Sequence, residues 1–171
     1  MARARRDLGP VRSVTPESLG KPGQRTFRVV IRADGGEATV WLEKEHMAAL
    51  AMSIQAVLEE APGEGSVAEP PGSVARAETR AVEFKAAALA IVYDSPRRTF
   101  GVLAYDADDA STNTATLAWW LTRAQARQLA EEAAEIVSSG RPICPLCHRP
   151  KDPEGHMCTE TNGHQPAKDH F

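Results

Sequence analysis

The sequence predicts an α+β fold in which antiparallel β-hairpins pack against two amphipathic helices. Two observations support this prediction. Apolar residues alternate with period two from Phe27 and run into the hairpin-turn sequence Asp34-Gly35-Gly36. In addition, residues 43–60 and 122–138 both repeat apolar residues at the spacing of one helix face. Hairpins and helices of this kind each have a bare apolar face, so we expect them to cover one another.

The first half of the chain is expected to contain an irregular start, one hairpin and one helix. Residues 1–25 are expected to form an irregular lead-in, because Gly9-Pro10 and Pro22-Gly23 interrupt any regular pattern. The hairpin is expected to span residues 27–42. The helix over residues 43–60 is expected to bury one face and to leave His46 in its first turn exposed. That face consists of Met47, Leu50, Ala51, Ile54, Val57 and Leu58.

A segment rich in proline and glycine separates the second half from the first. Residues 61–80 contain Pro62-Gly63 and Pro70-Pro71-Gly72, which favour a flexible linker inside an α+β core of residues 26–140. Thr122 is a residue type that caps helix N-termini, so the second helix is expected to begin there. Three strands are expected before it, over residues 89–93, 99–105 and 114–121.

The two halves resemble one another at a constant offset of 79 residues. Trp41-Leu42 and Trp120-Leu121 each lead into an expected helix, and the apolar pairs Leu50-Ala51 and Leu129-Ala130 follow at the same distance. An internal duplication of one strand-into-helix unit would explain the match. Chance similarity between two amphipathic helices is the alternative explanation.

Composition and charge argue against several classes of function. The formal net charge of −3 gives no electrostatic case for nucleic acid, because binding phosphates requires a clustered basic face. No stretch approaches the roughly 20 apolar residues of a membrane span, and no apolar segment follows the basic start of the chain. We therefore expect a cytoplasmic protein that contacts no membrane and does not act on nucleic acid.

The residues that indicate a specific chemistry lie in the tail, residues 141–171, which holds all three cysteines. Cys144 and Cys147 have the spacing of a zinc knuckle, in which two thiolates on a tight turn converge on one ion. His156 and Cys158 are two residues apart, and side chains at that spacing on an extended segment point the same way. Three thiolates and one imidazole suit zinc best. The sequence therefore predicts a structural Zn²⁺ site formed by these four side chains.

Two alternatives concern this cluster. The C-x2-C pair could instead be a redox pair, but the strand and helix that surround such a pair in thioredoxin-like proteins are not expected here. The identity of the fourth ligand is open, because His164 is an alternative to His156, and His148 and His170 are the other histidines of the tail. A fully ligated ion leaves no position for water or substrate, so a structural role is favoured.

Several short motifs are spread along the chain: Gly20 to Phe27, Trp41 to Glu45, Gly140 to Pro142, Cys144 to Cys147, Asp152 to His156, and Cys158 with Asn162-Gly163-His164. Together they resemble an uncharacterised bacterial family, catalogued as a domain of unknown function, number 3090. The resemblance covers nearly the whole chain, and its C-terminal cysteine and histidine motif is the most specific part. The family implies no activity, so the functional prediction rests on the residues.

One motif outside the tail, Gly23-Gln24-Arg25, is a candidate anion site. A guanidinium and an amide on a glycine-led loop can hydrogen-bond a phosphate or a carboxylate. The alternative is a turn that feeds the strand beginning near Phe27, with Arg25 bonded to loop carbonyls. We favour this alternative.

These observations favour a non-enzymatic zinc-binding protein that acts as an interaction or adaptor module through a partner protein. No Ser-His-Asp arrangement, phosphate-binding glycine loop or paired-carboxylate helix is visible in the sequence. One alternative is a hydrolase or transferase with a pocket between the two halves and Arg25 as its anion anchor. The other is nucleic-acid binding through the zinc module, by Arg141, His148, Arg149 and Lys151.

Overall fold

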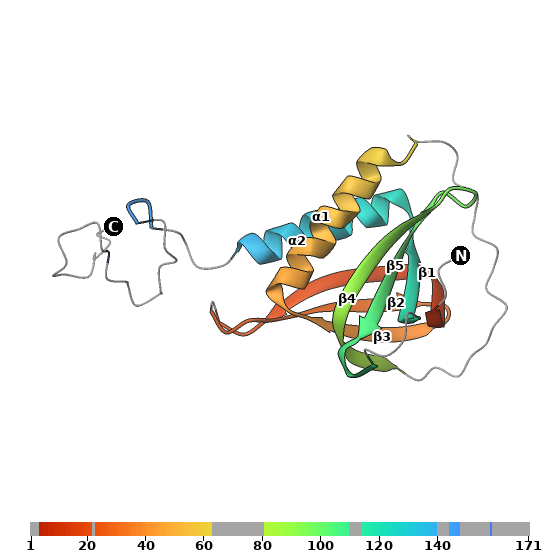
Figure 1. The fold of residues 1–171 in the computed structure, drawn as a ribbon, viewed down its shortest axis with the longest axis horizontal. Helices are drawn as coiled ribbons and strands as arrows, with labels where there is room; N and C mark the ends of the chain where they lie inside the picture. The colour runs from red at the N-terminus through yellow and green to blue at the C-terminus, as the bar shows by residue number, and fades with distance from the viewer. Residues whose placement is uncertain are drawn as a thin grey trace.

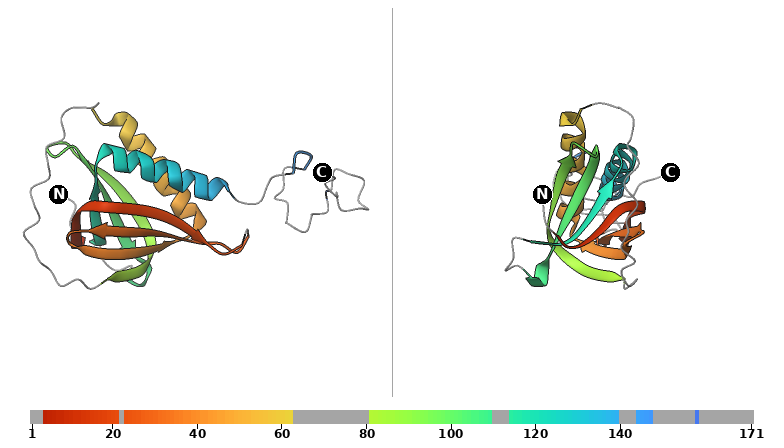
Figure 2. Two further views of the ribbon diagram at one scale, coloured as in Figure 1. Left: turned by 180° about the vertical axis from the view of Figure 1, so that it is seen from behind. Right: turned by 90° about the vertical axis from the view of Figure 1, so that its right-hand side faces the viewer.

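The computed structural model describes residues 4–21, 23–62, 81–109, 114–139, 144–147 and 158. Over these residues, six strands form a closed barrel in the order β1-β2-β3-β4-β5-β6, and two helices lie together over one side of it (Figure 1). Figure 2 shows the same arrangement from behind and from the side. The elements are β1 Ala4–Leu19, β2 Thr26–Ala33, β3 Gly36–Leu42, α1 Lys44–Glu60, β4 Val82–Asp94, β5 Thr99–Asp106, the 3-10 turn η1 Ala107–Asp109, β6 Ala115–Leu121 and α2 Arg123–Ser138. The predicted α+β class is confirmed.

Antiparallel hairpins build each half of the barrel, as predicted. The pairs β1–β2, β2–β3, β4–β5 and β5–β6 are all antiparallel. Two parallel contacts, β3 with β4 and β1 with β6, join the halves and close the barrel. A parallel contact between successive strands requires a long crossover, which α1 and the segment after it provide.

The N-terminal segment is a strand, so the expectation of an irregular lead-in over residues 1–25 was wrong for Ala4–Leu19. The first part of β1, Ala4 to Pro10, pairs with β6 in parallel. The second part, Val11 to Leu19, pairs with β2 in antiparallel orientation. β1 is therefore the strand that closes the barrel.

Two irregularities in β1 explain why its sequence does not show a strand pattern. The register shifts between Asp7 and Pro10 and again between Val11 and Ser13. Each shift changes which face of the sheet the next residue occupies, so the alternation of apolar residues is broken. Gly9, with φ +70°, adopts a conformation at the first shift that glycine tolerates best.

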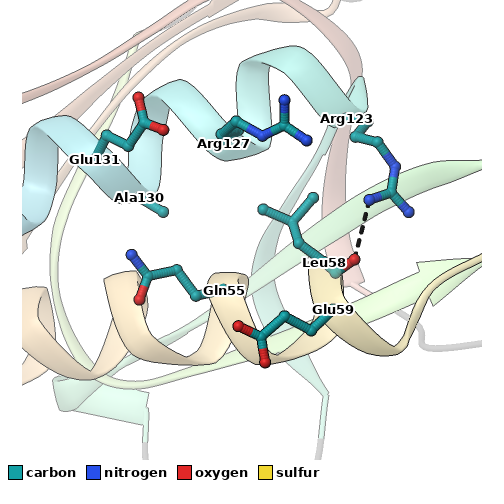
Figure 3. Close-up of a pocket in the computed structure, with 7 residues that line it drawn as sticks. All are labelled: Gln55, Leu58, Glu59, Arg123, Arg127, Ala130 and Glu131. Carbon is teal, nitrogen blue, oxygen red and sulfur yellow. Dashed lines mark hydrogen bonds between the residues drawn. The ribbon is translucent and has the colours of Figure 1, made fainter. Parts of the chain in front are cut away.

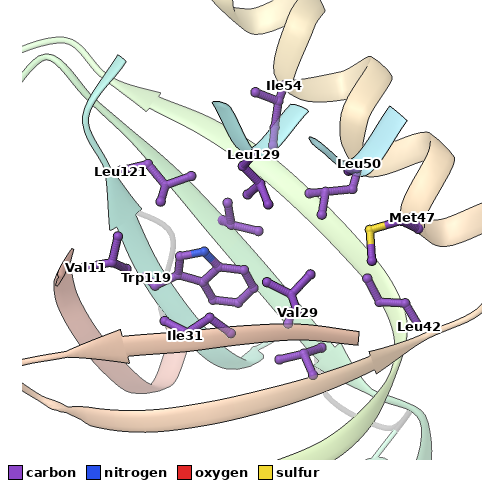
Figure 4. Packing of buried hydrophobic residues seen from close by; sticks show 14 of the residues in the cluster. Val11, Val29, Ile31, Leu42, Met47, Leu50, Ile54, Trp119, Leu121 and Leu129 are labelled. Atoms are coloured by element: carbon purple, nitrogen blue, oxygen red, sulfur yellow. The ribbon is translucent and has the colours of Figure 1, made fainter. Parts of the chain in front are cut away.

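The interior of the barrel is filled by strand side chains and by one face of each helix (Figure 4). Trp119 lies at the centre and is fully buried. In α1 the predicted face is confirmed, since its first four apolar residues are buried and Val57 and Leu58 pack partly against the core. In α2 the buried residues are Ala126, Leu129, Ala130 and Ala133.

The order of three strands followed by one helix occurs twice in the described residues. Both helices lie on the same side of the barrel and pack on each other (Figure 1). Trp41 donates a hydrogen bond from Nε1 to Glu83 across the β3–β4 contact at 2.7 Å, and Trp120 donates one to Asp7 across the β6–β1 contact at 3.1 Å. These are the equivalent environments that an internal duplication requires. A common origin of the two halves stays a hypothesis.

The two helices begin differently. Thr122 caps α2 as predicted: its hydroxyl accepts a hydrogen bond from the Gln125 amide, and the Gln125 side chain accepts one from the Thr122 amide. Gln125 also donates from Nε2 to the Val11 carbonyl at 3.1 Å, which ties α2 to β1. α1 begins after Glu43, whose side chain makes no capping bond and pairs with Lys85 instead.

If β1 is part of the barrel, Leu8→Ala should strongly destabilise the protein. Leu8 is 1% exposed, so its truncation leaves a cavity that should lower the free energy of unfolding by about 2–5 kcal/mol. Arg12→Ala is the matched control on the same strand, because Arg12 is exposed and its ion pair with Asp34 should contribute about 0–1 kcal/mol. Urea unfolding measures both. Equally small effects would mean that β1 is not an integral strand.

Candidate metal centre

The three cysteines converge, although 14 residues separate Cys144 from Cys158. Residues 144–147 form a turn that places Cys144 and Cys147 together. The Sγ atoms of Cys144, Cys147 and Cys158 all lie within 4.8 Å of one another. Cys144 and Cys158 are buried, and Cys147 is half-buried. In Figure 1 the turn is drawn in blue beyond the end of α2.

The spacing of the sulfur atoms fits a tetrahedral metal ion. Two thiolates bound to zinc at about 2.3 Å lie about 3.8 Å apart when the geometry is tetrahedral. The Sγ atoms of Cys144 and Cys158 are 3.9 Å apart. None of these three cysteines forms a disulfide. The residues present therefore fit a thiolate-bound ion, with the three thiols as its ligands.

The turn also favours the thiolate form of Cys144. Hydrogen bonds from the backbone of Cys147, and to a smaller extent from that of Leu146, lower the pKa of Cys144 to about 6, against the opposing effect of burial. Because metals bind the thiolate, this prepares the first ligand at neutral pH.

The predicted fourth ligand, His156, lies outside the described residues. His156, His164, His148 and His170 all fall in segments whose structure is not described, so the choice of His156 stays a prediction. Leu146, between the two cysteines of the turn, is 58% exposed, whereas Cys144 and Cys158 are buried.

Comparison with known protein families shows that the three cysteines lie within a family match. The family model described as "Protein of unknown function (DUF3090)" matches residues 7–158, from β1 to the third cysteine. The chain belongs to the DUF3090 family. The matched range ends at Cys158, so it includes the whole cysteine cluster. The resemblance inferred from the sequence is thus confirmed.

Other comparisons with this DUF3090 protein gave no relative of known function. No curated protein and no solved structure matches the chain. In the described part of the chain, no helix is long and apolar enough to cross a membrane.

The candidate anion site around Arg25 is a cleft whose basic side chains already bond to other side chains of the protein. Its volume is about 380 Å³, and it lies where β3 meets β4, with Trp41 and Lys85 in its wall. Arg25 donates a hydrogen bond to the hydroxyl of Ser139 at 2.9 Å. The sequence analysis had favoured hydrogen bonds from Arg25 to carbonyls of its own loop, and the described residues show none. Lys85 pairs with Glu43, and its hydrogen bond and positive charge lower the pKa of that carboxyl.

The loop before β2 has the turn that the glycine-led motif predicts. The backbone amide of Gln24 donates to the carbonyl of Lys21 at 2.9 Å, and Gly20 and Gly23 have positive φ values. A Cβ atom on Gly20 would lie 2.5 Å from the Gln24 carbonyl oxygen, so only glycine fits there. Anion binding by Gln24 and Arg25 stays a prediction.

A second cleft lies between the two helices, where α1 ends and α2 begins (Figure 3). It measures about 230 Å³, and Arg25 is not among its lining residues. Arg123 of α2 donates hydrogen bonds to the carbonyls of Leu58, Ala61 and Pro62 at 2.8–3.0 Å. The last carbonyls of a helix have no partners within it, so Arg123 caps α1 from the neighbouring helix.

Sequence reasoning missed Arg123 and misjudged His46. Arg123 follows the capping Thr122, and nothing in the local sequence indicates that its partners lie 61–65 residues earlier in the chain. His46, expected to be exposed, is half-buried, and its Nδ1 atom is buried without a hydrogen-bond partner in the described residues. A buried and unpaired polar atom requires an explanation.

The low pKa of Cys144 can be measured in the metal-free protein. One thiol should ionise with a midpoint near pH 6, because a lowered pKa means that the thiolate persists above that pH and is protonated below it. The ultraviolet absorbance of the thiolate reports this step, which should be absent in Cys144→Ser. Ionisation of all three thiols only in the ordinary range of a free cysteine would contradict the assignment.

Arg123→Met should reduce the free energy of unfolding by about 2 kcal/mol, since three carbonyls at the end of α1 lose a charged donor. Arg127→Met is the control, from the same helix and the same cleft, and should change it by about 0.5 kcal/mol or less. Chemical denaturation measures both. A loss no larger in Arg123→Met than in Arg127→Met would show that the cap is unimportant.

Proposed function

We propose that this DUF3090 protein is a non-enzymatic Zn²⁺-binding protein whose tail contacts a partner protein. The convergence of three thiols from two segments of the tail supports the metal assignment. Zinc suits these ligands because thiolates are soft and because it has no redox chemistry of its own. When bound, the ion would act as a cross-link and hold the turn at residues 144–147 against the segment around Cys158.

The surface of the turn supports a role in protein contact. Leu146 is 58% exposed, while Cys144 and Cys158 are 3% and 4% exposed. An apolar side chain held in water by a rigid, cross-linked turn is suited to the pocket of a protein partner. It offers nothing to a phosphate backbone, which is bound by basic side chains.

We prefer this function to an enzymatic one because of the charges around Arg25. The Arg25 guanidinium already donates to Ser139, and Lys85 is paired with Glu43. The downward shift of the Glu43 pKa is that of a surface ion pair, whereas a general acid or base usually has its pKa moved toward neutrality. The alternative of nucleic-acid binding relies on residues that lie outside the described part of the chain. We prefer a protein partner because the formal net charge of the chain is −3.

The metal assignment is tested by native mass spectrometry of the purified chain. We expect one zinc ion per chain, and no ion in Cys144→Ser, Cys147→Ser or Cys158→Ser, because each removes one of three converging ligands. His156→Ala should lower zinc affinity strongly, whereas His170→Ala, a histidine of the same tail, should not. Loss of zinc in His164→Ala but not in His156→Ala would move the fourth ligand to His164. Full zinc content in the cysteine variants would refute the site.

The contact role is tested with Leu146→Asp, which should keep the zinc ion but lose the partner. The zinc-loaded chain on an affinity column should retain a specific protein, and Leu146→Asp and chelated wild-type chain should both fail to retain it. Met52→Asp, which changes the most exposed large apolar residue of α1, should retain the protein normally. Retention that is unchanged by Leu146→Asp would show that the turn is not the contact surface.

A further inference from the structure

The cleft where β3 meets β4 has the size of a site for a small molecule. Its volume of about 380 Å³ falls within the roughly 300–1,000 Å³ of such sites. Gln24, the second residue of the predicted anion motif, is not among the described residues that line it. The lining comes from both halves of the barrel and consists of Arg25, Thr26, Trp41, Leu42, Glu43 and Lys85.

Arg25 has no acidic partner in the described part of the chain. Its one hydrogen bond there is to the neutral hydroxyl of Ser139 at 2.9 Å, and a guanidinium has five N–H donors. Lys85 and Glu43 form an ion pair, so the two cations and one anion leave the lining with a net charge of +1. Hydrogen bonds between a cation and an anion are about twice as strong as those between neutral groups, so an acid group can compete with Ser139 for Arg25.

The indole of Trp41 gives the cleft a flat surface that two neighbours hold in place. Its Nε1 donates to Glu83 at 2.7 Å, and the guanidinium of Arg28 lies over the ring, 5.3 Å from its centroid. A ring fixed in this way has little side-chain entropy left to lose when a flat ligand packs against it.

In the equivalent corner of the second half of the barrel, the matching residue stabilises the fold. At the offset of 79 residues, Thr122 corresponds to Glu43, and it caps α2. Glu43 makes no capping bond and pairs with Lys85 instead. Position 43 thus lacks a stabilising cap and has a charged contact in its place, and such departures from the locally favoured residue are expected at functional sites.

The arginines of β2 beside the cleft are paired. Arg28 forms an ion pair with Glu17, and Arg32 forms one with Glu37. A long anionic polymer such as nucleic acid requires a run of unpaired cations, which these described residues do not provide. The ligand that suits the cleft is therefore a small molecule with one acid group.

We propose that this cleft binds a small organic anion whose carboxylate or phosphate group is attached to a flat ring. The acid group would accept two parallel hydrogen bonds from Arg25, and the ring would lie against Trp41. Binding of this kind requires no general acid or base, so it is compatible with a non-enzymatic protein. It also needs neither the metal nor the contact role of the tail.

The proposal is tested by NMR of the full-length chain, through the indole N–H signals of its three tryptophans. The signal of Trp41, identified by its absence in Trp41→Phe, should shift with naphthoate and saturate with a Kd below about 1 mM. The signals of Trp119, which is fully buried, and of Trp120, which lies at the β6–β1 contact, should not shift.

Three further probes define the ligand. Naphthamide keeps the ring and acetate keeps the acid group, and each should bind at least about tenfold more weakly than naphthoate. Naphthyl phosphate carries the other acid group on the same ring, and the tighter of the two ring-bearing anions identifies the acid group that the cleft prefers.

Two variants separate binding from folding. Arg25→Gln should weaken naphthoate binding at least about tenfold, whereas Arg32→Gln, on β2 outside the cleft, should leave the affinity unchanged. Glu43→Gln removes the anion from the lining and releases Lys85, so it should tighten binding about threefold or more, which misfolding cannot do.

The proposal is overturned if no ligand moves the Trp41 signal, or if naphthamide binds as tightly as naphthoate. It is also overturned if Arg25→Gln has no larger effect than Arg32→Gln, or if Glu43→Gln weakens binding.

Discussion

The fold depends on two long strands, β1 and β4, that each change neighbour part-way along their length. β1 runs from β6 to β2, and β4 runs from β3 to β5, so that two three-stranded meanders close into one barrel. Each change of neighbour leaves a stretch of strand edge uncovered on one side. The helices lie at these places, and their apolar faces complete the core around Trp119. The closure of the barrel and the placement of the helices thus both follow from the change of neighbour in β1 and β4.

The two uncovered edges have different chemistry, although their topology is the same. At β1, Gln125 both completes the cap of α2 and bonds the Val11 carbonyl. At β4, the corresponding residue is His46, whose buried Nδ1 atom has no hydrogen-bond partner among the described residues. An exposed strand edge is a general site for pairing with another chain, and proteins usually block it. At both edges a helix packs alongside the strand, α2 at β1 and α1 at β4.

We propose that the segments around the cysteines are held together by a metal ion. A short segment cannot bury enough apolar surface to order itself, and a metal ion is a common substitute for a core. The sulfur atoms of Cys144, Cys147 and Cys158 lie close enough for one ion, and the backbone of the turn lowers the pKa of Cys144. In the proposed contact role, the exposed Leu146 is the part of the turn that would meet a partner.

Features that depend on neighbouring residues were predicted from the sequence. Features that depend on contacts between distant residues were missed. The helix faces, the Asp34-Gly35-Gly36 turn and the Thr122 cap follow from spacing and residue type, and the structure has all of them. β1 was missed because two register shifts break its alternation around Gly9-Pro10. The parallel contacts, the Arg123 cap and the partner of Arg25 depend on residues far away in the chain. The cysteine cluster was predictable because the spacing of the cysteines along the sequence is typical of metal sites, whatever fold surrounds them.

The most direct test of the metal centre is X-ray absorption at the zinc edge of the purified protein. We expect three sulfur ligands near 2.3 Å and one nitrogen ligand near 2.0 Å, because Cys144, Cys147 and Cys158 converge and a histidine is the predicted fourth ligand. A spectrum with nitrogen and oxygen ligands alone, or with a single sulfur, would contradict it. Such a result would mean that the thiols lie together in the fold for a reason other than zinc.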